Sequence, residues 1–145
     1  VEGFVEINQI VKKAMESIYI PRGVETRVSY MSGLLVSEAG GDKMTRVVEN
    51  LVRNAVEAMP EGGTLEVRIS RVEGAARIEV RDEGGGIPPE AVDRLFQPFN
   101  STKQGHAGLG LAFCRRTLES MGGSIEAVAV EKGTAMVVTV PLRNI

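Results

Sequence analysis

Apolar positions recur at steps of three and four residues in three stretches of the chain, a period that is typical of amphipathic helices. These stretches are residues 5–18, 42–59 and 108–121. Pro21 and Gly23 follow the first stretch and Pro60 follows the second, and both residue types favour the end of a helix. Asp42 is the expected N-cap of the second helix, because its carboxylate can accept a hydrogen bond from a free backbone N–H group.

Shorter segments between these helices alternate apolar and polar residues or form brief apolar runs, and both patterns indicate strands. The expected strands are residues 24–30, 34–36, 64–71, 75–81, 124–130 and 134–140. Glycine-containing turns at residues 73–74 and 132–133 predict two hairpins. A short helix is expected over residues 88–94, and a mobile loop over residues 95–107. This order of elements predicts one mixed sheet with helices packed on one face.

Size and composition indicate one globular domain. The chain has 145 residues, 43% hydrophobic and 25% charged, which is enough to bury one core. We expect residues 1–145 to be a single domain and, from the start at Val1 close to a helix, a piece of a longer protein. The net charge of -2 does not favour nucleic-acid binding, and no apolar run reaches the roughly 18 residues of a membrane span. The single cysteine, Cys114, has apolar neighbours that favour packing, and it indicates a reducing, cytoplasmic environment.

The second helix has a narrow polar stripe on an otherwise apolar circumference. At about 100° per residue, its members are Lys43, Arg46, Asn50, Asn54 and Glu57. A solvated face is the ordinary explanation, but Asn is a poor helix former and two occur here at i and i+4. An Asn side-chain oxygen is a hard, neutral ligand for Mg²⁺. The stripe is therefore a candidate phosphate–metal site.

Residues 82–88 place three successive glycines, Gly84 to Gly86, directly after an expected strand. Glycine lets a ligand come close to the backbone. Asp82 at the strand end can accept a hydrogen bond from the amino group of adenine, whereas guanine would place a repelled carbonyl there. Ile87 could pack on the base. The alternative is a plain loop in which Asp82 is a turn residue.

A second glycine-rich segment runs directly into the third expected helix. Its residues are Gly105, His106, Ala107, Gly108, Leu109, Gly110 and Leu111. Such a loop can present backbone N–H groups to an anion, although an ordinary turn before a helix has the same composition. Phe96 and Phe99 precede it, and we expect them to anchor their loop. Ser101, Thr102 and Lys103 are natural phosphate contacts.

These motifs fit neither a P-loop nor a Rossmann site, but in this order they resemble the ATP-binding catalytic domain of sensor histidine kinases. That family belongs to the group that includes gyrase, the heat-shock-90 chaperone and a mismatch-repair ATPase. The segments that carry the resemblance are N-x-x-x-N-A at 50–55, D-x-G-x-G at 82–86, F-x-P-F-x-S-T-K at 96–103, the glycine loop at 106–111 and G-T-A at 133–135. Residues 50–59 and 98–103 look closest to the nitrogen-regulation type of kinase.

The resemblance implies an α/β fold of the Bergerat type, a two-layer α+β sandwich. Its sheet would be mixed and mostly antiparallel, with about five strands and three main helices on one face. ATP or ADP with Mg²⁺ would lie between helices and sheet, under a lid at residues 98–107. The implied catalytic residues are Asn50 beside the phosphates, Asn54 as the Mg²⁺ ligand, and Lys103.

The remaining implied residues surround the nucleotide. Asp82 would bind the adenine amino group, and Thr134 would support adenine through water. Gly84 and Gly86 would shape the base pocket. The other members of the binding set are Ile87, Thr102, Lys103, Gly108, Leu109, Gly110 and Leu111.

Two positions depart from sensor kinases, and a third differs from gyrase-type ATPases. Glu57 stands where many sensor kinases carry a lysine that reaches the phosphates, so Lys103 or Arg46 would supply that charge. His106 replaces the first glycine of the second loop, and we interpret it as a loop residue near the phosphates. Asn50 stands where gyrase-type ATPases carry a glutamate, and it cannot act as that base. We therefore expect weak ATP hydrolysis and transfer to a partner group.

The leading hypothesis is transfer of the γ-phosphate of ATP to a histidine on a separate helical hairpin domain of the same protein, with a response-regulator receiver domain as an indirect partner. No contact with nucleic acid or membrane is expected. Two alternatives remain open. One is a serine kinase of the anti-sigma kind, and the other is a nucleotide-sensing module that binds ATP without transferring it.

Overall fold

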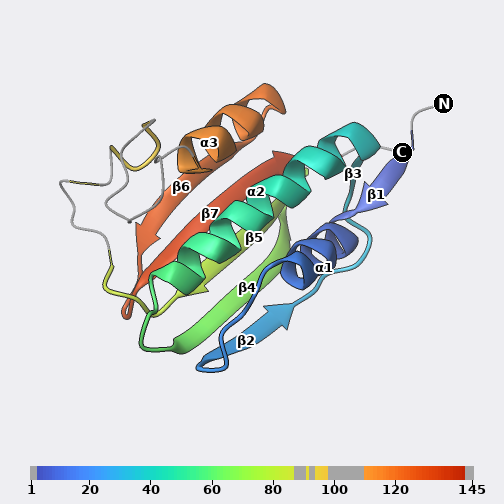
Figure 1. Ribbon diagram of the computed structural model, residues 1–145. Helices are drawn as coiled ribbons and strands as arrows, with labels where there is room; N and C mark the ends of the chain where they lie inside the picture. The colour runs from blue at the N-terminus through green and yellow to red at the C-terminus, as the bar shows by residue number, and fades with distance from the viewer. Residues whose placement is uncertain (1–2, 87–90, 92–93, 98–109, 143–145) are drawn as a thin grey trace.

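The computed structural model describes residues 3–86, 91, 94–97 and 110–142. Its elements in chain order are β1 (Phe4–Glu6), α1 (Ile7–Ser17), β2 (Val24–Ser29), β3 (Leu35–Ser37), α2 (Glu38–Glu57), β4 (Gly63–Val72), β5 (Ala75–Asp82), α3 (Gly110–Ser120), β6 (Ser124–Ala129) and β7 (Thr134–Pro141). Figure 1 shows two layers, with the three helices lying side by side over one face of the large sheet. The predicted two-layer α/β sandwich is confirmed.

The large sheet has the strand order β2-β4-β5-β7-β6. Only β2 and β4 pair in parallel, and the other three neighbouring pairs are antiparallel. Both predicted hairpins are present, β4–β5 and β6–β7. The β1 and β3 strands form a separate two-stranded antiparallel sheet. The large sheet is therefore mixed and mostly antiparallel, as the sequence predicted, but the strand expected at residues 34–36 lies in the second sheet, so the expectation of one sheet was wrong.

The core lies between the helices and the sheet. Every second residue of β5 faces the helices, so that Ala76, Ile78 and Val80 are buried. The broad apolar face of α2 packs against them with Met44, Val47, Val48, Leu51, Val52 and Ala55. Full burial of one such aliphatic side chain stabilises the fold by about 2 kcal/mol. Both patterns agree with the periodicities read from the sequence.

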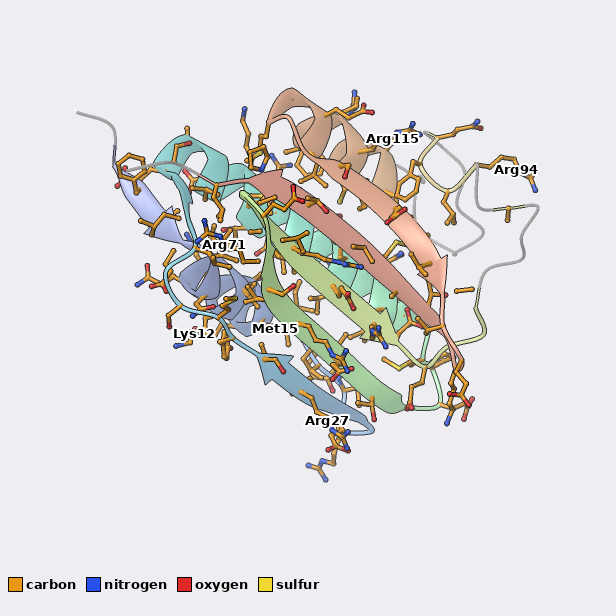
Figure 2. All side chains as sticks on the ribbon, turned by 180° about the vertical axis from the view of Figure 1, so that it is seen from behind. Lys12, Met15, Arg27, Arg71, Arg94 and Arg115 are labelled. Atoms are coloured by element: carbon orange, nitrogen blue, oxygen red, sulfur yellow. The ribbon has the colours of Figure 1, made fainter. Side chains whose placement is uncertain are left out.

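The opposite face of the sheet carries charged side chains and is not covered by any helix that the structure describes (Figure 2). Arg81 and Glu79 of β5 form an ion pair of 3.1 Å, and Arg77 approaches Glu79 to 3.3 Å. On the neighbouring β4 strand, Glu66 lies opposite Arg81 and Arg68 lies opposite Glu79. Opposite charges on facing residues are favourable across a strand pair. This face is therefore suited to contact with solvent. Within the described residues, no helix combines the length and apolar character of a membrane span.

Two helix starts differ from the prediction. Residues 5–6 belong to β1 rather than to the first helix, because Val5 pairs with Val36 in the β1–β3 ladder. The α2 helix begins at Glu38, and its N-cap is Ser37, whose Oγ accepts a hydrogen bond from Gly40 N at 3.1 Å. The predicted cap Asp42 therefore lies inside the helix.

The first turn of α2, which the sequence analysis did not predict, contains Gly40 and Gly41. Glycine disfavours a helix in isolation. Close packing requires both glycines. A Cβ atom on Gly41 would collide with Cγ1 of Val5, and one on Gly40 would lie 2.9 Å from Cε of Met121. Tertiary contacts thus override the local preference. The expected helix at residues 88–94 and loop at 95–107 fall mostly outside the described residues.

The Gly41 contact gives a prediction of stability. Gly41→Ala should lower the free energy of unfolding by about 1–2 kcal/mol, because the collision with Val5 outweighs the gain of about 1 kcal/mol in helix propensity. Urea unfolding followed by circular dichroism measures this. Gly74→Ala is the matched control, since no atom lies within 4 Å of a Cβ built there. Adding Val5→Ala should recover part of the loss, and a Gly41→Ala protein as stable as the wild type would contradict the assignment.

Candidate functional site

Two asparagines lie one helical turn apart on α2, and the first of them, Asn50, lies at the junction with α3. Both Asn50 and Asn54 are half-buried. Nδ2 of Asn50 donates a hydrogen bond to the carbonyl oxygen of Arg46 at 2.9 Å. The opposite amide atom, Oδ1, faces the start of α3, where a Cβ on Gly110 would lie 3.1 Å from it. The absence of a side chain at Gly110 therefore keeps space beside the Asn50 oxygen.

Asp82 is the last residue of β5 and lies on the face of the sheet that the helices cover. Only 9% of it is exposed. Its Oδ1 accepts a hydrogen bond from the backbone N–H of Gly84 at 2.8 Å. Gly84 in turn lies against the end of α2, since any Cβ on it would collide with the carbonyl oxygen of Ala58. A glycine is needed here for close approach of two backbone segments.

The neighbouring strand supports Asp82 from the other side. Thr134 of β7 is directly opposite Asp82 in the β5–β7 ladder and is 5% exposed, so both side chains point to the helix-covered face. Gly133 has a φ of 102°, a value that favours glycine. A Cβ on Gly133 would also collide with the carbonyl oxygen of Asp82. Gly133 and Thr134 therefore pack closely against the end of β5.

These contacts bring the two predicted halves of the site together. Ala58 touches the loop that follows Asp82, and Asn54 lies one helical turn before Ala58, about 6 Å along the axis. Asn50 lies one turn further, beside Gly110. The carboxylate and the asparagine stripe therefore border the same region, bounded by α2, the start of α3 and the ends of β5 and β7 (Figure 1).

The other expected site residues divide into two groups. Gly86 is exposed with a φ of 76°, and Leu111 is half-buried against the core. The remaining residues lie outside the part of the chain that the structure describes: Ile87, Thr102, Lys103, Gly108 and Leu109, together with Phe99 and His106.

Aromatic side chains pack near the polar stripe of α2 and near the start of α3. The guanidinium of Arg46 lies 4.5 Å from the ring centre of Phe113, which connects α2 to α3. Phe96 is half-buried and packs against the core, which agrees with an anchoring role.

Cys114 is fully buried, with Sγ 3.8 Å from the carbonyl oxygen of Val47. Burial raises the pKa of this thiol to about 12, so Cys114 is a packing residue, as predicted.

Glu83 is a structural member of this region that the motifs did not single out. It occupies the variable position of D-x-G-x-G, and no local pattern in the sequence identifies its contacts. Its Oε1 accepts a hydrogen bond from the backbone N–H of Thr64 at 2.8 Å, and its own N–H donates to Sδ of Met59 at 3.3 Å.

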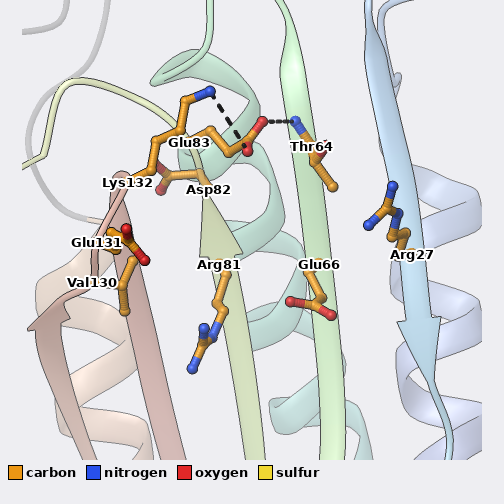
Figure 3. Close-up of a pocket in the computed structure, with 9 residues that line it drawn as sticks. All are labelled: Arg27, Thr64, Glu66, Arg81, Asp82, Glu83, Val130, Glu131 and Lys132. Carbon is orange, nitrogen blue, oxygen red and sulfur yellow. Dashed lines mark hydrogen bonds and ion pairs between the residues drawn. The ribbon is translucent and has the colours of Figure 1, made fainter.

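A hollow at the same end of the sheet opens on the face that the helices leave free (Figure 3). It is lined by Arg27, Thr64, Glu66, Arg81, Asp82, Glu83, Val130, Glu131 and Lys132. Both cationic and anionic side chains line it, and the asparagines of α2 lie on the other side of the sheet. This hollow and the region bordered by Asn50 and Asn54 therefore lie on opposite faces of the sheet and meet at Asp82, the last residue of β5, which lines the hollow as well.

The fold and this region define an α/β sandwich with a polar site between its helices and one end of its sheet. Residues 40–144 match the protein family described as "Histidine kinase-, DNA gyrase B-, and HSP90-like ATPase". This match covers well over half of the chain, and the chain belongs to that family of ATP-binding domains.

Curated relatives are bacterial sensor kinases. Sporulation kinase D of Bacillus subtilis (strain 168) is 33% identical over 141 residues, which cover 94% of this chain and 28% of that protein. The sensory histidine kinase/phosphatase NtrB of Salmonella typhimurium is 34% identical over 142 residues, 90% of this chain and 41% of that protein. The chain thus spans less than half the length of these relatives.

Solved structures of histidine kinases have the same fold. The mycobacterial sensor histidine kinase MprB superposes with a TM-score of 0.85 at 26% identity, and each chain is fully covered. The catalytic domain of histidine kinase ThkA gives a TM-score of 0.84 at 27% identity, covering 97% of this chain and 95% of that one. The expected resemblance to sensor histidine kinases is confirmed.

Proposed function

We propose that this chain is the catalytic domain of a longer sensor histidine kinase, which binds ATP with Mg²⁺ and donates the γ-phosphate to a histidine of another domain. One observation carries the proposal beyond family membership. The buried Asp82 and the half-buried asparagines Asn50 and Asn54 border one region, and these are the polar groups that adenine and a metal-bound triphosphate require.

Asp82 reads the base in this proposal. A carboxylate accepts a hydrogen bond from the exocyclic amino group of adenine, and it repels the carbonyl that guanine carries there. Gly84 and Gly86 shape the base pocket, Gly84 through its close approach to the end of α2, and Ile87 packs on the base. Thr134, opposite Asp82, supports adenine through water.

Asn54 holds Mg²⁺ and Asn50 lies beside the phosphates. The donor chemistry fits, because neutral amide oxygens suit a hard cation that already has phosphate ligands. When bound, Mg²⁺ neutralises charge on the transferring phosphate. Thr102 and Lys103 contact the phosphates, and residues 108–111 contribute backbone N–H groups and the hinge of a lid.

Catalysis then consists of positioning and charge neutralisation. Asn50 has no basic group that could activate water, so the phosphate passes to a partner group rather than to solvent. The acceptor histidine lies on a helical hairpin domain of the same protein, and a response-regulator receiver domain takes the phosphate afterwards. We place this signalling reaction in the cytoplasm.

Phosphotransfer is tested by mixing the chain with a histidine-bearing hairpin domain and γ-³²P-labelled ATP. We expect acid-labile label on the hairpin and none when its histidine is replaced by alanine. Binding of ATP without any label on the hairpin would instead identify a nucleotide-sensing module. Label on a serine of a partner would indicate the anti-sigma type of kinase.

Base recognition is tested by Asp82→Asn. Loss of a hydrogen bond to a charged acceptor costs about 1.5–3 kcal/mol, so the dissociation constant for ATP should rise about 10- to 100-fold. Isothermal titration calorimetry measures this. Asp42→Asn, at an exposed position of α2, is the control and should bind as the wild type does. Equal ATP affinity in Asp82→Asn and the wild type would refute the role of Asp82.

The metal role of Asn54 predicts an effect that depends on Mg²⁺. Asn54→Ala should weaken ATP binding about tenfold with Mg²⁺ present, because one inner-sphere oxygen is lost, and should change it little in EDTA. Arg53→Ala removes the neighbouring exposed side chain of the same helix and serves as control. An equal loss with and without Mg²⁺ would show that Asn54 does not bind the metal.

A further inference from the structure

Glu83 links the end of β5 to three other segments of the fold. Its Oε1 accepts from Thr64 N at 2.8 Å, and its Oε2 lies 3.9 Å from Nζ of Lys132 in the β6–β7 turn (Figure 3). Its backbone N–H donates to Sδ of Met59, just after α2, at 3.3 Å. One residue thus ties the strand end to β4, to the α2–β4 connection and to the neighbouring turn.

The carboxylate of Glu83 is directed along the end of the sheet toward β4 (Figure 3). Asp82, one residue earlier, lies on the helix-covered face with the nucleotide-binding region. The Glu83 carboxylate is thus engaged by Thr64 and Lys132, away from that region. The backbone of Asp82, which adjoins Glu83, is the direct route by which Glu83 can act on a ligand there.

The peptide that joins Asp82 to Glu83 is enclosed on two sides. A Cβ on Gly133 would collide with the Asp82 carbonyl and lie 2.9 Å from Cα of Glu83. On another side, the peptide N–H donates to Sδ of Met59 at 3.3 Å. Gly63 packs beside that sulfur and the Glu83 side chain, since a Cβ on it would lie 2.9 Å from Sδ of Met59 and 3.3 Å from Oε1 of Glu83. The peptide between Asp82 and Glu83 therefore has little room to move, and the hydrogen bonds of Glu83 hold it in one position.

We propose that Glu83 is a positioning residue that sets base selectivity by holding the Asp82 carboxylate at a fixed place relative to α2. The proposal rests on the proposed function, in which Asp82 reads adenine. The hydrogen bond from Thr64 N carries the effect, because it is short and ends on a charged acceptor. The pair with Lys132 contributes little, since that lysine side chain is 75% exposed and the separation is 3.9 Å.

The test compares affinities for ATP and for inosine triphosphate, which carries a carbonyl in place of the adenine amino group. Glu83→Ala should lower the ratio of ATP to inosine triphosphate affinity about fivefold or more, because a displaced Asp82 binds the amino group less well and repels the carbonyl less. Glu83→Gln keeps an acceptor for Thr64 N and should retain the ratio within about twofold. Lys132→Ala is the matched control and should retain it fully.

A Glu83→Ala protein with a lower melting temperature and an unchanged ratio would overturn the proposal, since a purely structural role predicts that result. If Glu83→Ala does not fold, Glu83→Asp is judged by the same ratio, because the shorter side chain keeps the charge but no longer reaches Thr64.

The proposed function is judged separately. A wild type that binds both nucleotides equally, or an Asp82→Asn variant with an unchanged ratio, would refute base reading by Asp82. A discriminating wild type together with an equally discriminating Glu83→Ala protein would refute only the role of Glu83.

Discussion

The site depends on the close approach of the loop after β5 to the last turn of α2. Gly84 lies so near the carbonyl of Ala58 that no side chain fits between them. The same contact fixes how far Asp82 lies from the polar stripe of the helix, because Asn54 is one turn from Ala58. A larger residue at position 84 would separate strand and helix, and the two halves of the site would no longer border one region.

Holding an acid at this place has an energetic cost that the surrounding backbone offsets. Asp82, of which 9% is exposed, loses most of its hydration, and its carboxylate recovers part of this through the N–H of Gly84. Glycines at 84 and 133 in turn make the backbone less constrained before folding. Placing a polar group toward the helices thus lowers the stability of this region, as is common at functional sites.

Much of this arrangement could be predicted from sequence periodicity, and the failures have a physical pattern. The apolar face of α2, the alternation in β5 and both hairpins depend on local order, and each was predicted. The first turn of α2 was missed because Gly40 and Gly41 are required by Val5 and Met121, which are distant in sequence. Glu83 was missed for the same reason, since its partners Met59 and Thr64 are recognisable only once the chain has folded.

The two faces of the sheet explain why a nucleotide site belongs on the helix side. On the open face, charged residues of β4 and β5 already neutralise one another, as Arg81 and Arg77 do with Glu79, so a triphosphate would have to break existing pairs. On the helix side, Asn50, Asn54 and Asp82 border one region that is held by backbone contacts among α2, β5 and β7. A ligand that touches all three elements binds only when they are assembled, and its binding free energy therefore adds to the stability of the fold. The elements that surround Asp82 are thus also those that a nucleotide bound there would hold together.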